Sequence, residues 1–244
     1  MKKYIKLILT LSILLNILCI TVGSYEVYRK GGVGWVSLKV NSMINSKDYK
    51  KQPDYYFIKK SIYDDLNMSN DAIVFVGDSI TDNFEWGEYF KNYNIQNRGI
   101  SGDTISGILN RITSISNENP KSIFIMAGIN DFRNGATSEY VYNKYMNIIN
   151  KIQEDSPNTN IYIQSTLPVN IKMANHYYDL DEIIKLNLKL SELSNKNEKI
   201  KYFDLYELLK ASDGQLDAKY TYDGVHLNTL GYSVWTKTIS KFVN

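Results

Sequence analysis

A run of apolar residues that ends in a glycine most constrains the fold of this chain. Residues 72–76 read Ala-Ile-Val-Phe-Val and include three β-branched side chains. A continuous apolar run of this length is typical of a strand buried on both faces of a parallel sheet. Gly77 ends the run and allows a sharp reversal that residues with a Cβ resist. Ser79 then follows the carboxyl end of the strand, which is the edge where α/β proteins place their chemistry.

The composition narrows the class of protein. The chain has 244 residues, of which 43% are hydrophobic and 22% are charged. These values are typical of one folded domain with an additional segment, and they exclude disorder for most of the chain. Basic residues number 28 against 26 acidic residues, with no long basic cluster, so no nucleic-acid partner is predicted. The single cysteine, Cys19, excludes an internal disulfide framework and a cysteine-rich zinc site.

The first 23 residues predict a membrane anchor or a signal segment. Two lysines precede an apolar stretch over residues 4–23, which has the length of about 20 residues that a membrane-spanning helix needs. This length favours an uncleaved anchor, with Lys6 reaching the lipid headgroups. Cleavage after Gly23 or Ser24 would instead give a secreted protein. Both alternatives place the rest of the chain outside the cytoplasm.

The remaining chain divides into residues 24–70, interpreted as a stalk and lead-in with a short helix over 55–66, and a domain over 71–244. From residue 71 onward, strand and helix patterns alternate. The predicted strands are 72–76, 93–99, 122–128, 161–168 and 200–205, and the predicted helices are 84–91, 104–117, 138–154, 179–195 and 229–243. This alternation predicts a parallel sheet with helices on both faces and right-handed crossovers.

Candidate site residues follow four of these strands. Ser79 follows the first strand, Gly102 the second and Asn130 the third, while Asp223 and His226 come after the fifth. In a doubly wound sheet of order 2-1-3-4-5, strand one lies between strands two and three, so their outgoing loops converge on one crevice. The histidine would have to cross about 14 Å, at about 4.8 Å per strand spacing, and the long segment before it is sufficient.

These residues predict nucleophilic catalysis by a serine. The Ser79 hydroxyl needs a base, and His226 is the candidate because histidine, with an ordinary pKa near 6.5, can accept a proton near neutral pH. Asp223 can accept a hydrogen bond from Nδ1 and hold Nε2 toward the serine. Attack on an acyl carbonyl creates an oxyanion, whose candidate donors are the N–H groups of Ser79 and Gly102 and the amide of Asn130.

The motifs resemble the four ordered blocks of the SGNH/GDSL hydrolase family. The blocks are Gly77-Asp78-Ser79, the segment around Gly102, Gly128-Ile129-Asn130-Asp131 and Asp223-Gly224-Val225-His226-Leu227. The resemblance covers about residue 73 to the C-terminus and implies a flavodoxin-like three-layer α/β/α fold. It also implies a catalytic triad of Ser79, His226 and Asp223. The implied oxyanion hole comprises Ser79, Gly102 and Asn130. The resemblance further implies ester hydrolysis that needs neither a metal nor a cofactor.

Other polar residues near these motifs have structural interpretations. Asp78, Asp103 and Asp131 are interpreted as carboxylates that brace turns, since Asp commonly bonds nearby backbone. His176 follows the fourth strand and is an alternative substrate contact, but it lacks an Asp three residues earlier and is disfavoured as the base. Asp223 and His226 are three residues apart, which is also a spacing found in pairs of metal ligands. No third ligand cluster accompanies this pair, so no metal is predicted.

The leading functional hypothesis is a serine esterase, anchored or secreted, that removes short acyl groups, most simply acetyl, from a carbohydrate. Connections of ordinary length, without an evident lid or long acyl tunnel, motivate the short acyl group. A lysophospholipase or other lipid esterase and an O-acyltransferase with the same triad are alternatives. A non-catalytic surface-binding module is the alternative from another class. The predicted partners are a small acyl ester, on a carbohydrate or a lipid, and the membrane through residues 4–23.

Overall fold

Five parallel strands form one sheet in the order β2-β1-β3-β4-β5, as predicted. The strands are β1 (Ile73–Gly77), β2 (Ile95–Gly99), β3 (Ser122–Met126), β4 (Asn160–Gln164) and β5 (Ile200–Phe203). The computed structural model describes residues 2–29, 32–36, 40, 54–194 and 197–243. Neighbouring strands pair in parallel throughout, so all five carboxyl ends lie at one edge of the sheet.

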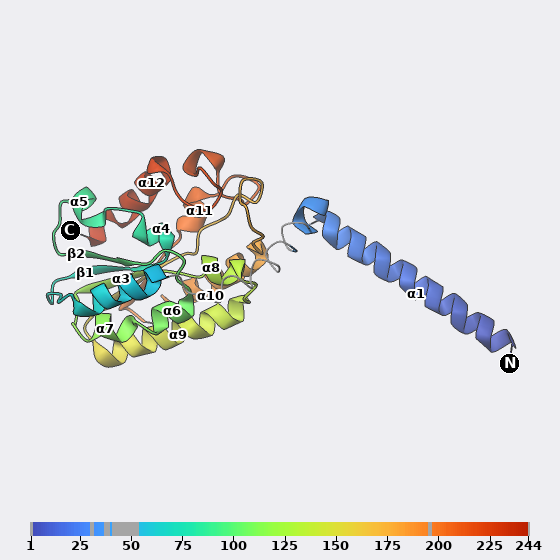
Figure 1. The fold of residues 1–244 in the computed structure, drawn as a ribbon, viewed down its shortest axis with the longest axis horizontal. Coiled ribbons are helices and arrows are strands. Elements are labelled where there is room, and N and C mark those ends of the chain that lie inside the picture. The colour runs from blue at the N-terminus through green and yellow to red at the C-terminus, as the bar shows by residue number, and fades with distance from the viewer. Residues whose placement is uncertain (1, 30–31, 37–39, 41–53, 195–196, 244) are drawn as a thin grey trace.

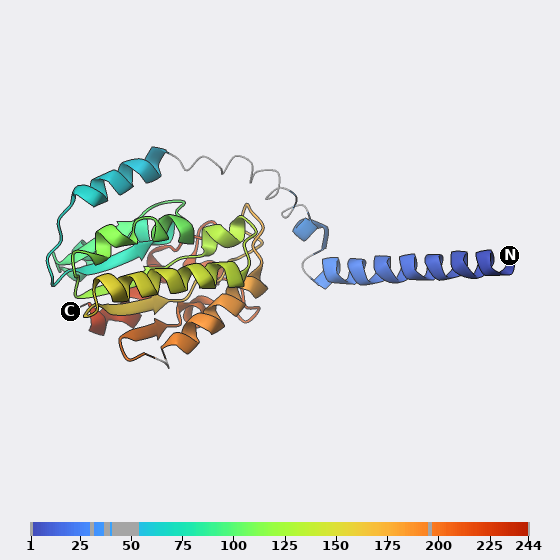
Figure 2. The same ribbon diagram turned by 90° about the horizontal axis from the view of Figure 1, so that it is seen from below.

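Helices cover both faces of the sheet and complete a three-layer α/β/α fold (Figure 1). One side carries α5 (Trp86–Phe90), α11 (Leu205–Leu209) and α12 (Thr229–Ile239), and the other carries α7 (Ile112–Ser116), α9 (Ser138–Asp155) and α10 (Leu180–Leu193). The remaining helices of the domain are α3 (Asp54–Asp65), α4 (Ser79–Asp82), α6 (Ile105–Leu109) and α8 (Ile129–Arg133), with 3₁₀ turns at Ala218–Tyr220 and Ser240–Phe242. Figure 2 shows α9 in front of the sheet with α10 beside it.

The central strands are buried on both faces because both faces are covered. All residues of β1 and β3 are buried, as their apolar sequences predict. Phe75 and Phe124 are partners in the β1–β3 register, and their rings stack with centroids 4.7 Å apart. Trp86 stacks on Phe75 at 4.1 Å, and Phe203 lies parallel to Phe124 at 6.3 Å. This row of rings packs side chains from β1, β3 and β5 into one core.

One predicted helix, over residues 104–117, is two short helices in the structure. Thr104 caps α6 as expected, because its hydroxyl accepts a hydrogen bond from the N–H of Gly107. The helical path breaks at Arg111, whose φ of −124° and ψ of 0° precede α7. The prediction of one continuous helix was wrong because Arg111 turns inward to form an ion pair with Asp103. The sequence also missed α4, α8 and α11, which are too short to show a helical period.

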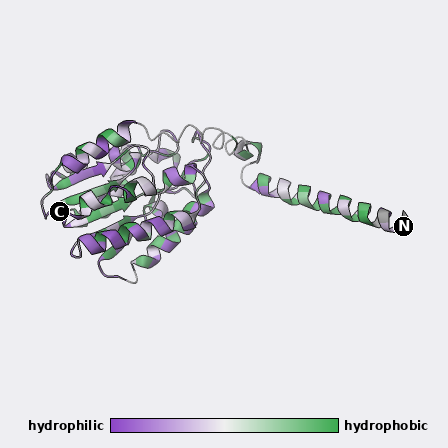
Figure 3. Cartoon of the chain, turned by 60° about the horizontal axis from the view of Figure 1, so that its bottom comes forward, coloured by the Kyte–Doolittle hydropathy of each residue, from purple (hydrophilic) through white to green (hydrophobic). Residues whose placement is uncertain are grey.

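A long helix, α1 (Lys2–Arg29), precedes the domain. Its segment Ile8–Arg29 has 22 residues, is not buried and is apolar enough to cross a membrane, although a signal sequence meets the same criteria. Hydrophobic residues recur along the whole length of the helix (Figure 3). The helix continues beyond residue 23, where the anchor or signal segment is predicted to end.

The helix expected over 55–66 is present as α3 and packs on the domain. Tyr56 is only 5% exposed, and its hydroxyl donates a hydrogen bond to the carbonyl oxygen of Gly107 at 2.9 Å. Parts of the predicted stalk over 24–70 lie outside the described residues, namely 30–31, 37–39 and 41–53.

We expect Phe124→Ala to lower the free energy of unfolding by about 3–5 kcal/mol, because it removes a fully buried ring and leaves a cavity in the sheet core. The measurement is chemical denaturation of the full chain in detergent, followed by tryptophan fluorescence. Tyr93→Ala, at a side chain that is 96% exposed, is the matched control and should change the same quantity by less than about 0.5 kcal/mol. Equal losses in the two variants would contradict the described packing.

Candidate active site

The ends of the three central strands lie side by side, which brings their outgoing loops together. Gly77, the last residue of β1, is paired with Gly99 of β2 and with Met126 of β3. The loops after these strands therefore leave the sheet at the same edge. Three of the predicted site residues lie just beyond these strand ends: Ser79, Gly102 and Asn130.

Ser79 is the first residue of α4, and its position depends on the turn before it. A Cβ at Gly77 would lie 2.1 Å from the Thr81 hydroxyl oxygen and 2.7 Å from a backbone carbonyl oxygen of β3, so only glycine fits. Asp78 is extended, and its side chain caps α4 by accepting a hydrogen bond from the N–H of Ile80 at 3.0 Å. The turn thus presents a half-buried Ser79 at the carboxyl edge of the sheet.

The imidazole of His226 lies between the Ser79 hydroxyl and the Asp223 carboxylate. Its Nε2 is 2.8 Å from Ser79 Oγ, and its Nδ1 is 2.6 Å from Asp223 Oδ2. An ionised carboxylate can only accept hydrogen bonds, so Nδ1 carries the proton of a neutral imidazole and Nε2 accepts from the Ser79 hydroxyl. The three predicted residues are therefore in hydrogen-bond contact, although 147 positions separate the serine from the histidine.

Asp223 is held by its own turn. Its Oδ1 accepts hydrogen bonds from the N–H groups of Val225 at 2.9 Å and His226 at 2.8 Å. Partial burial acts to raise the pKa of Asp223, but the hydrogen bonds from the His226 side chain and from these backbone N–H groups outweigh it and hold the pKa below its ordinary value. The carboxylate is therefore ionised at neutral pH and keeps the imidazole oriented.

Gly224 lets this turn pack against the loop after β4. Its φ of +87° lies in the left-handed region, and a Cβ there would lie 2.5 Å from the carbonyl oxygen of Asn170. The N–H of Asn170 donates to the Gly224 carbonyl oxygen at 2.8 Å. Thr221 accepts from the Gly224 N–H at 2.9 Å and donates to the His226 carbonyl oxygen at 2.7 Å. These contacts fix His226 relative to the sheet although its loop comes from beyond β5.

Gly102 and Asn130 lie on the loops that flank Ser79. Gly102 has a φ of +79°, in the region that favours glycine. Asn130 is buried, and its Nδ2 donates to the Asp103 carbonyl oxygen at 2.9 Å, which joins the loop after β3 to the loop after β2. Within the described part of the chain, the backbone N–H groups of Ser79 and Gly102 donate to no other residue. These two groups and the second amide hydrogen of Asn130 are therefore available as donors.

Three aspartates behind this edge brace its loops, as the sequence predicts. Asp103 forms a buried ion pair with Arg111, with 2.8 Å between Oδ2 and Nε. Asp131 accepts a hydrogen bond from the N–H of Ile105 at 2.9 Å. Burial, reinforced by neighbouring carboxylates, raises the pKa of Asp78 and that of Asp131 to about 7. Both carboxyl groups are therefore partly protonated near neutral pH.

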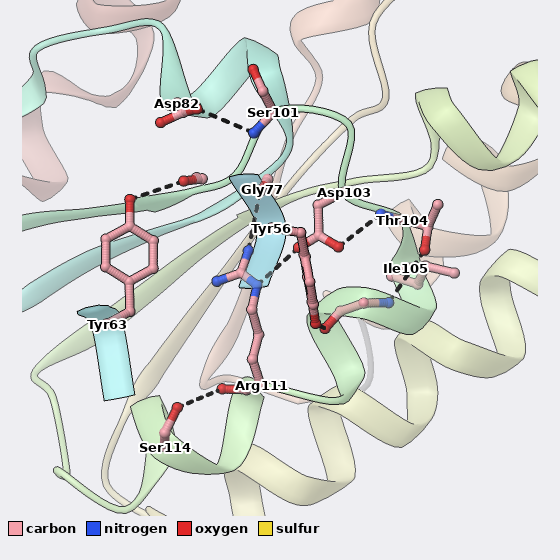
Figure 4. Close-up of polar contacts among 12 residues, drawn as sticks. Tyr56, Tyr63, Gly77, Asp82, Ser101, Asp103, Thr104, Ile105, Arg111 and Ser114 are labelled. Atoms are coloured by element: carbon pink, nitrogen blue, oxygen red, sulfur yellow. Dashed lines mark hydrogen bonds and ion pairs between the residues drawn. The ribbon is translucent and has the colours of Figure 1, made fainter. Parts of the chain in front are cut away.

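Arg111 is the residue of this region that sequence reasoning missed. Its Nη2 donates to the carbonyl oxygen of Gly77 at 3.1 Å while its Nε donates to Asp103, so one guanidinium joins the end of β1 to the loop after β2 (Figure 4). The Arg111 and Asp103 side chains are 2% and 0% exposed. The sequence did contain a signal for this contact, namely an arginine between apolar helical positions. A charged side chain at such a position is buried only with a partner.

His176 lies in the loop after β4 and takes no part in the contact between Ser79 and His226. Its Nε2 is 2.5 Å from Nη2 of Arg133 in α8. Burial and the charge of Arg133 lower the pKa of His176, so the neutral ring accepts from the guanidinium. The next residue, Tyr177, packs edge to face against Trp35, with ring centroids 5.7 Å apart. A substrate contact by His176 stays a prediction.

The fold and this arrangement together define a class of protein. A serine, an imidazole and a carboxylate in hydrogen-bonded series at the carboxyl edge of a parallel sheet are the arrangement of a serine hydrolase. Among the residues that the structure describes, no group of three or more His, Cys, Asp or Glu side chains is placed to hold a metal ion.

Comparison with known families identifies this class more narrowly. The sequence model of the GDSL-like lipase/acylhydrolase family matches residues 75–234, which is more than half of the chain. The chain therefore belongs to this family, as its motifs predict, and is a carboxylic ester hydrolase.

Similar proteins come from animals and bacteria. The chain is 25% identical over 214 residues to platelet-activating factor acetylhydrolase IB subunit alpha1 of Bos taurus, across 84% of this chain and 80% of the relative. A solved structure from Streptococcus pneumonia, provisionally described as a platelet activating factor, is 26% identical with a TM-score of 0.70 and covers 78% of this chain and 94% of its own. A GDSL-like lipase from Bacteroides thetaiotaomicron shares the fold, with 23% identity, a TM-score of 0.66 and coverage of 77% and 96%.

We expect Asp78→Asn to change how stability depends on pH. Asp78 has a pKa of about 7 in the folded chain, above its ordinary value of 3.8, so the stability that this group contributes is complete below about pH 4 and is lost as pH rises through 7. The free energy of unfolding of the wild type should therefore fall relative to that of the variant between about pH 4 and 7, by at most about 1.4 kcal/mol per pH unit.

Urea denaturation of the full chain in detergent, at a series of pH values, measures this difference. Asp65→Asn, at an exposed carboxylate of α3, is the matched control and should show no comparable slope. A constant difference between wild type and Asp78→Asn across the whole range would contradict a raised pKa at this position.

Proposed function

We propose that this protein is a serine esterase that removes short acyl groups, most simply O-acetyl, from a carbohydrate. The observation that carries the proposal is the pair of contacts from Ser79 Oγ to His226 Nε2 at 2.8 Å and from His226 Nδ1 to Asp223 Oδ2 at 2.6 Å. Ser79 is the nucleophile, His226 is the general base and then the general acid, and Asp223 orients the imidazole.

The proposed reaction passes through an acyl-enzyme. Ser79 Oγ attacks the acyl carbon while its proton moves to His226 Nε2, and a tetrahedral intermediate forms. The imidazolium then gives this proton to the leaving alcohol oxygen as the ester bond breaks, and the acyl group stays on Ser79. The same imidazole next deprotonates a water molecule, which attacks the acyl carbon. The imidazolium then returns the proton to Ser79 Oγ as the bond between the acyl carbon and Oγ breaks, and the carboxylic acid is released. Asp223 stabilises the imidazolium in both halves of the reaction.

The proposed oxyanion hole comprises the N–H groups of Ser79 and Gly102 and the Nδ2 of Asn130. Attack places negative charge on the carbonyl oxygen, and donors that are already in position stabilise this charge without reorganisation. Losing one such donor typically costs about 3–4 kcal/mol of transition-state stabilisation. The left-handed turn at Gly102 and the hydrogen bond from Asn130 to Asp103 support this assignment, since both hold the donors before substrate binds.

We expect the full chain to hydrolyse p-nitrophenyl acetate, and we expect Ser79→Ala and His226→Ala each to lower kcat by about 10³-fold or more. Each variant removes a group that forms a bond or transfers a proton in the reaction. His176→Ala is the matched control and should retain activity, because His176 contacts Arg133 rather than Ser79. Wild-type turnover in Ser79→Ala would overturn the proposal.

The pH dependence of the same reaction gives a second readout. His226 can accept a proton only as the neutral imidazole, so kcat/KM should fall on acidification. Asp223, whose pKa is held low by its hydrogen bonds, stays ionised over this range. A profile that is flat from about pH 5 to 8 would contradict His226 as the base.

Three observations support a short acyl group on a carbohydrate as the substrate. Within the described residues, the connections from β1, β2 and β3 to the next helix have five residues or fewer, which leaves little chain there for a lid or an acyl tunnel. The Bos taurus relative is named an acetylhydrolase, which favours acetyl. Tyr222, which is 82% exposed and precedes Asp223, offers an aromatic face on which a sugar ring can stack.

A lipid ester such as a lysophospholipid is the second candidate substrate, and α1 favours it. The segment Ile8–Arg29 could hold the enzyme at a membrane, where such esters occur. An O-acyltransferase would share the acyl-enzyme and give the acyl group to a sugar hydroxyl instead of water. A non-catalytic surface-binding module is disfavoured, since it would not need the contact between Ser79 and His226.

We expect kcat/KM to be highest for acetate and to fall with acyl length across p-nitrophenyl esters from acetate to laurate. We also expect faster release of acid from an acetylated oligosaccharide than from lysophosphatidylcholine, because the short connections after β1, β2 and β3 leave little chain to form a tunnel for a long acyl group. The measurement is titration of released acid, with and without an added sugar acceptor. The reverse order would favour the lipid esterase, and an acetylated acceptor in place of free acetate would favour the transferase.

We further propose the arrangement of the whole chain. Residues 1–23 are a membrane anchor or signal segment that contacts the membrane through residues 4–23, residues 24–70 are a stalk and lead-in, and residues 71–244 are the catalytic domain. The apolar length of α1 supports this arrangement. The catalytic domain then lies outside the cytoplasm, either held at the membrane or secreted after cleavage of the signal segment.

A further inference from the structure

Helix α3 lies outside the segment that the family model matches and contacts the elements at both ends of the loop that carries Gly102. The matched segment begins at residue 75, whereas α3 covers Asp54–Asp65. Figure 4 shows tyrosines of α3 beside the segment between β2 and α6, and Asp82 bonded to Ser101 of that segment. The proposed reaction needs no side chain from α3, yet this helix bonds both elements that flank the loop and also Asp82, which bonds the loop at Ser101.

Two tyrosine hydroxyls of α3 hold this loop at its ends. Tyr63 donates a hydrogen bond at 3.0 Å to the carbonyl oxygen of Gly99, where β2 ends. Tyr56 donates at 2.9 Å to the carbonyl oxygen of Gly107 within α6. Gly102 lies between these two points, so the helix fixes the backbone on both sides of it.

Asp82 holds the loop next to Gly102. Its Oδ2 accepts hydrogen bonds from the N–H of Ser101 at 3.1 Å and from the hydroxyl of Tyr55 at 2.7 Å. Lys59 Nζ lies 3.4 Å from the other carboxylate oxygen. Asp82 is also the last residue of α4, the helix that begins with the candidate nucleophile. One carboxylate therefore connects α4, the loop after β2 and α3.

Gly102 has no support from the described residues on the side where a Cβ would project. No heavy atom lies within 4 Å of the position that a Cβ would take, and its φ is +79°. The direction of its N–H is therefore set by the Ser101 peptide and by the fixed ends of the loop. A donor in an active site is effective only when it is held within about 0.5 Å and 10–20° of the productive geometry.

We propose that Tyr55, Tyr63 and Asp82 are positioning residues that hold the Gly102 N–H in the oxyanion hole, so that the lead-in helix α3 is part of the active enzyme. This inference rests on the proposed function. Because the oxyanion exists only after attack, loss of these contacts should weaken transition-state stabilisation rather than substrate binding, so kcat should fall while KM changes little.

The test compares variants of the full chain in detergent with p-nitrophenyl acetate as substrate. Asp82→Ala removes the acceptor for the Ser101 N–H and should lower kcat about 10–100-fold, with KM within about twofold. Asp82→Asn keeps an oxygen that can accept from Ser101 and should restore most of the activity. The double variant Tyr55→Phe with Tyr63→Phe loses two hydroxyls without loss of either ring and should lower kcat about 3–10-fold.

Two further measurements separate positioning from a loss of folded protein. Titration with a fluorophosphonate counts the molecules that have a reactive Ser79, so kcat is expressed per active site. Affinity for a boronic acid, which forms a tetrahedral adduct on a serine, should fall in step with kcat/KM. Lys60→Met is the matched control, because Lys60 pairs with Asp64 within α3. It should leave the number of reactive serines, kcat per active site and the affinity for the boronic acid unchanged.

Two results would overturn the inference while the proposed function stands. One is wild-type kcat per active site in both Asp82→Ala and the double phenylalanine variant, with Ser79→Ala inactive. The other is a rise in KM in these variants with unchanged kcat and unchanged affinity for the boronic acid. Equal hydrolysis by the wild type and Ser79→Ala would instead overturn the proposed function and this inference with it.

Discussion

The buried ion pair between Arg111 and Asp103 joins three of the loops that form the candidate site, namely those after β1, β2 and β3. Arg111 also donates to the carbonyl oxygen of Gly77, two residues before Ser79, and the carbonyl oxygen of Asp103 accepts from Asn130. Neither charge is exposed, so removing one partner would leave the other unpaired in the interior, which typically costs about 3–5 kcal/mol. The turn before the nucleophile and both flanking loops therefore depend on the same pair of charges.

The acidic side chains around this pair show how the fold accommodates several carboxyl groups in one place. Asp78 and Asp131 are buried. Asp78 accepts a hydrogen bond from the backbone of its own turn, and Asp131 accepts one from the backbone at the start of α6. Burial makes the charged form unfavourable, and proton uptake relieves the repulsion from nearby carboxylates. Raised pKa values are common in active sites. Here the hydrogen bonds of Asp78 and Asp131 to backbone N–H groups indicate that the two side chains stabilise loops. Asp223, which accepts from an imidazole and two N–H groups, has the opposite shift.

The layers of the fold and the polar residues at the strand ends were predictable because their signals are local in sequence. The apolar residues of β1 and β3 indicate strands covered on both faces, and the spacing of Asp223 and His226 indicates an acid and a base on one turn. The contacts that hold the loops were not predictable, because their partners are distant. Tyr56 bonds a carbonyl 51 positions away and Tyr63 one that is 36 positions away, and a tyrosine on a short helix gives no indication of such a partner. The break at Arg111 was missed for the same reason, since the apolar spacing around it fits one helix equally well.

The exposure of the His226–Asp223 pair bears on the size of molecule that the enzyme can process. Their side chains are 40% and 47% exposed, so the proposed acid–base pair lies at the rim of the domain rather than at the bottom of a cavity. Under the proposed reaction, a polymer could present a decorated unit from the middle of its backbone without threading a free end into the protein. Such an enzyme would act at internal positions of a polysaccharide as readily as at chain termini.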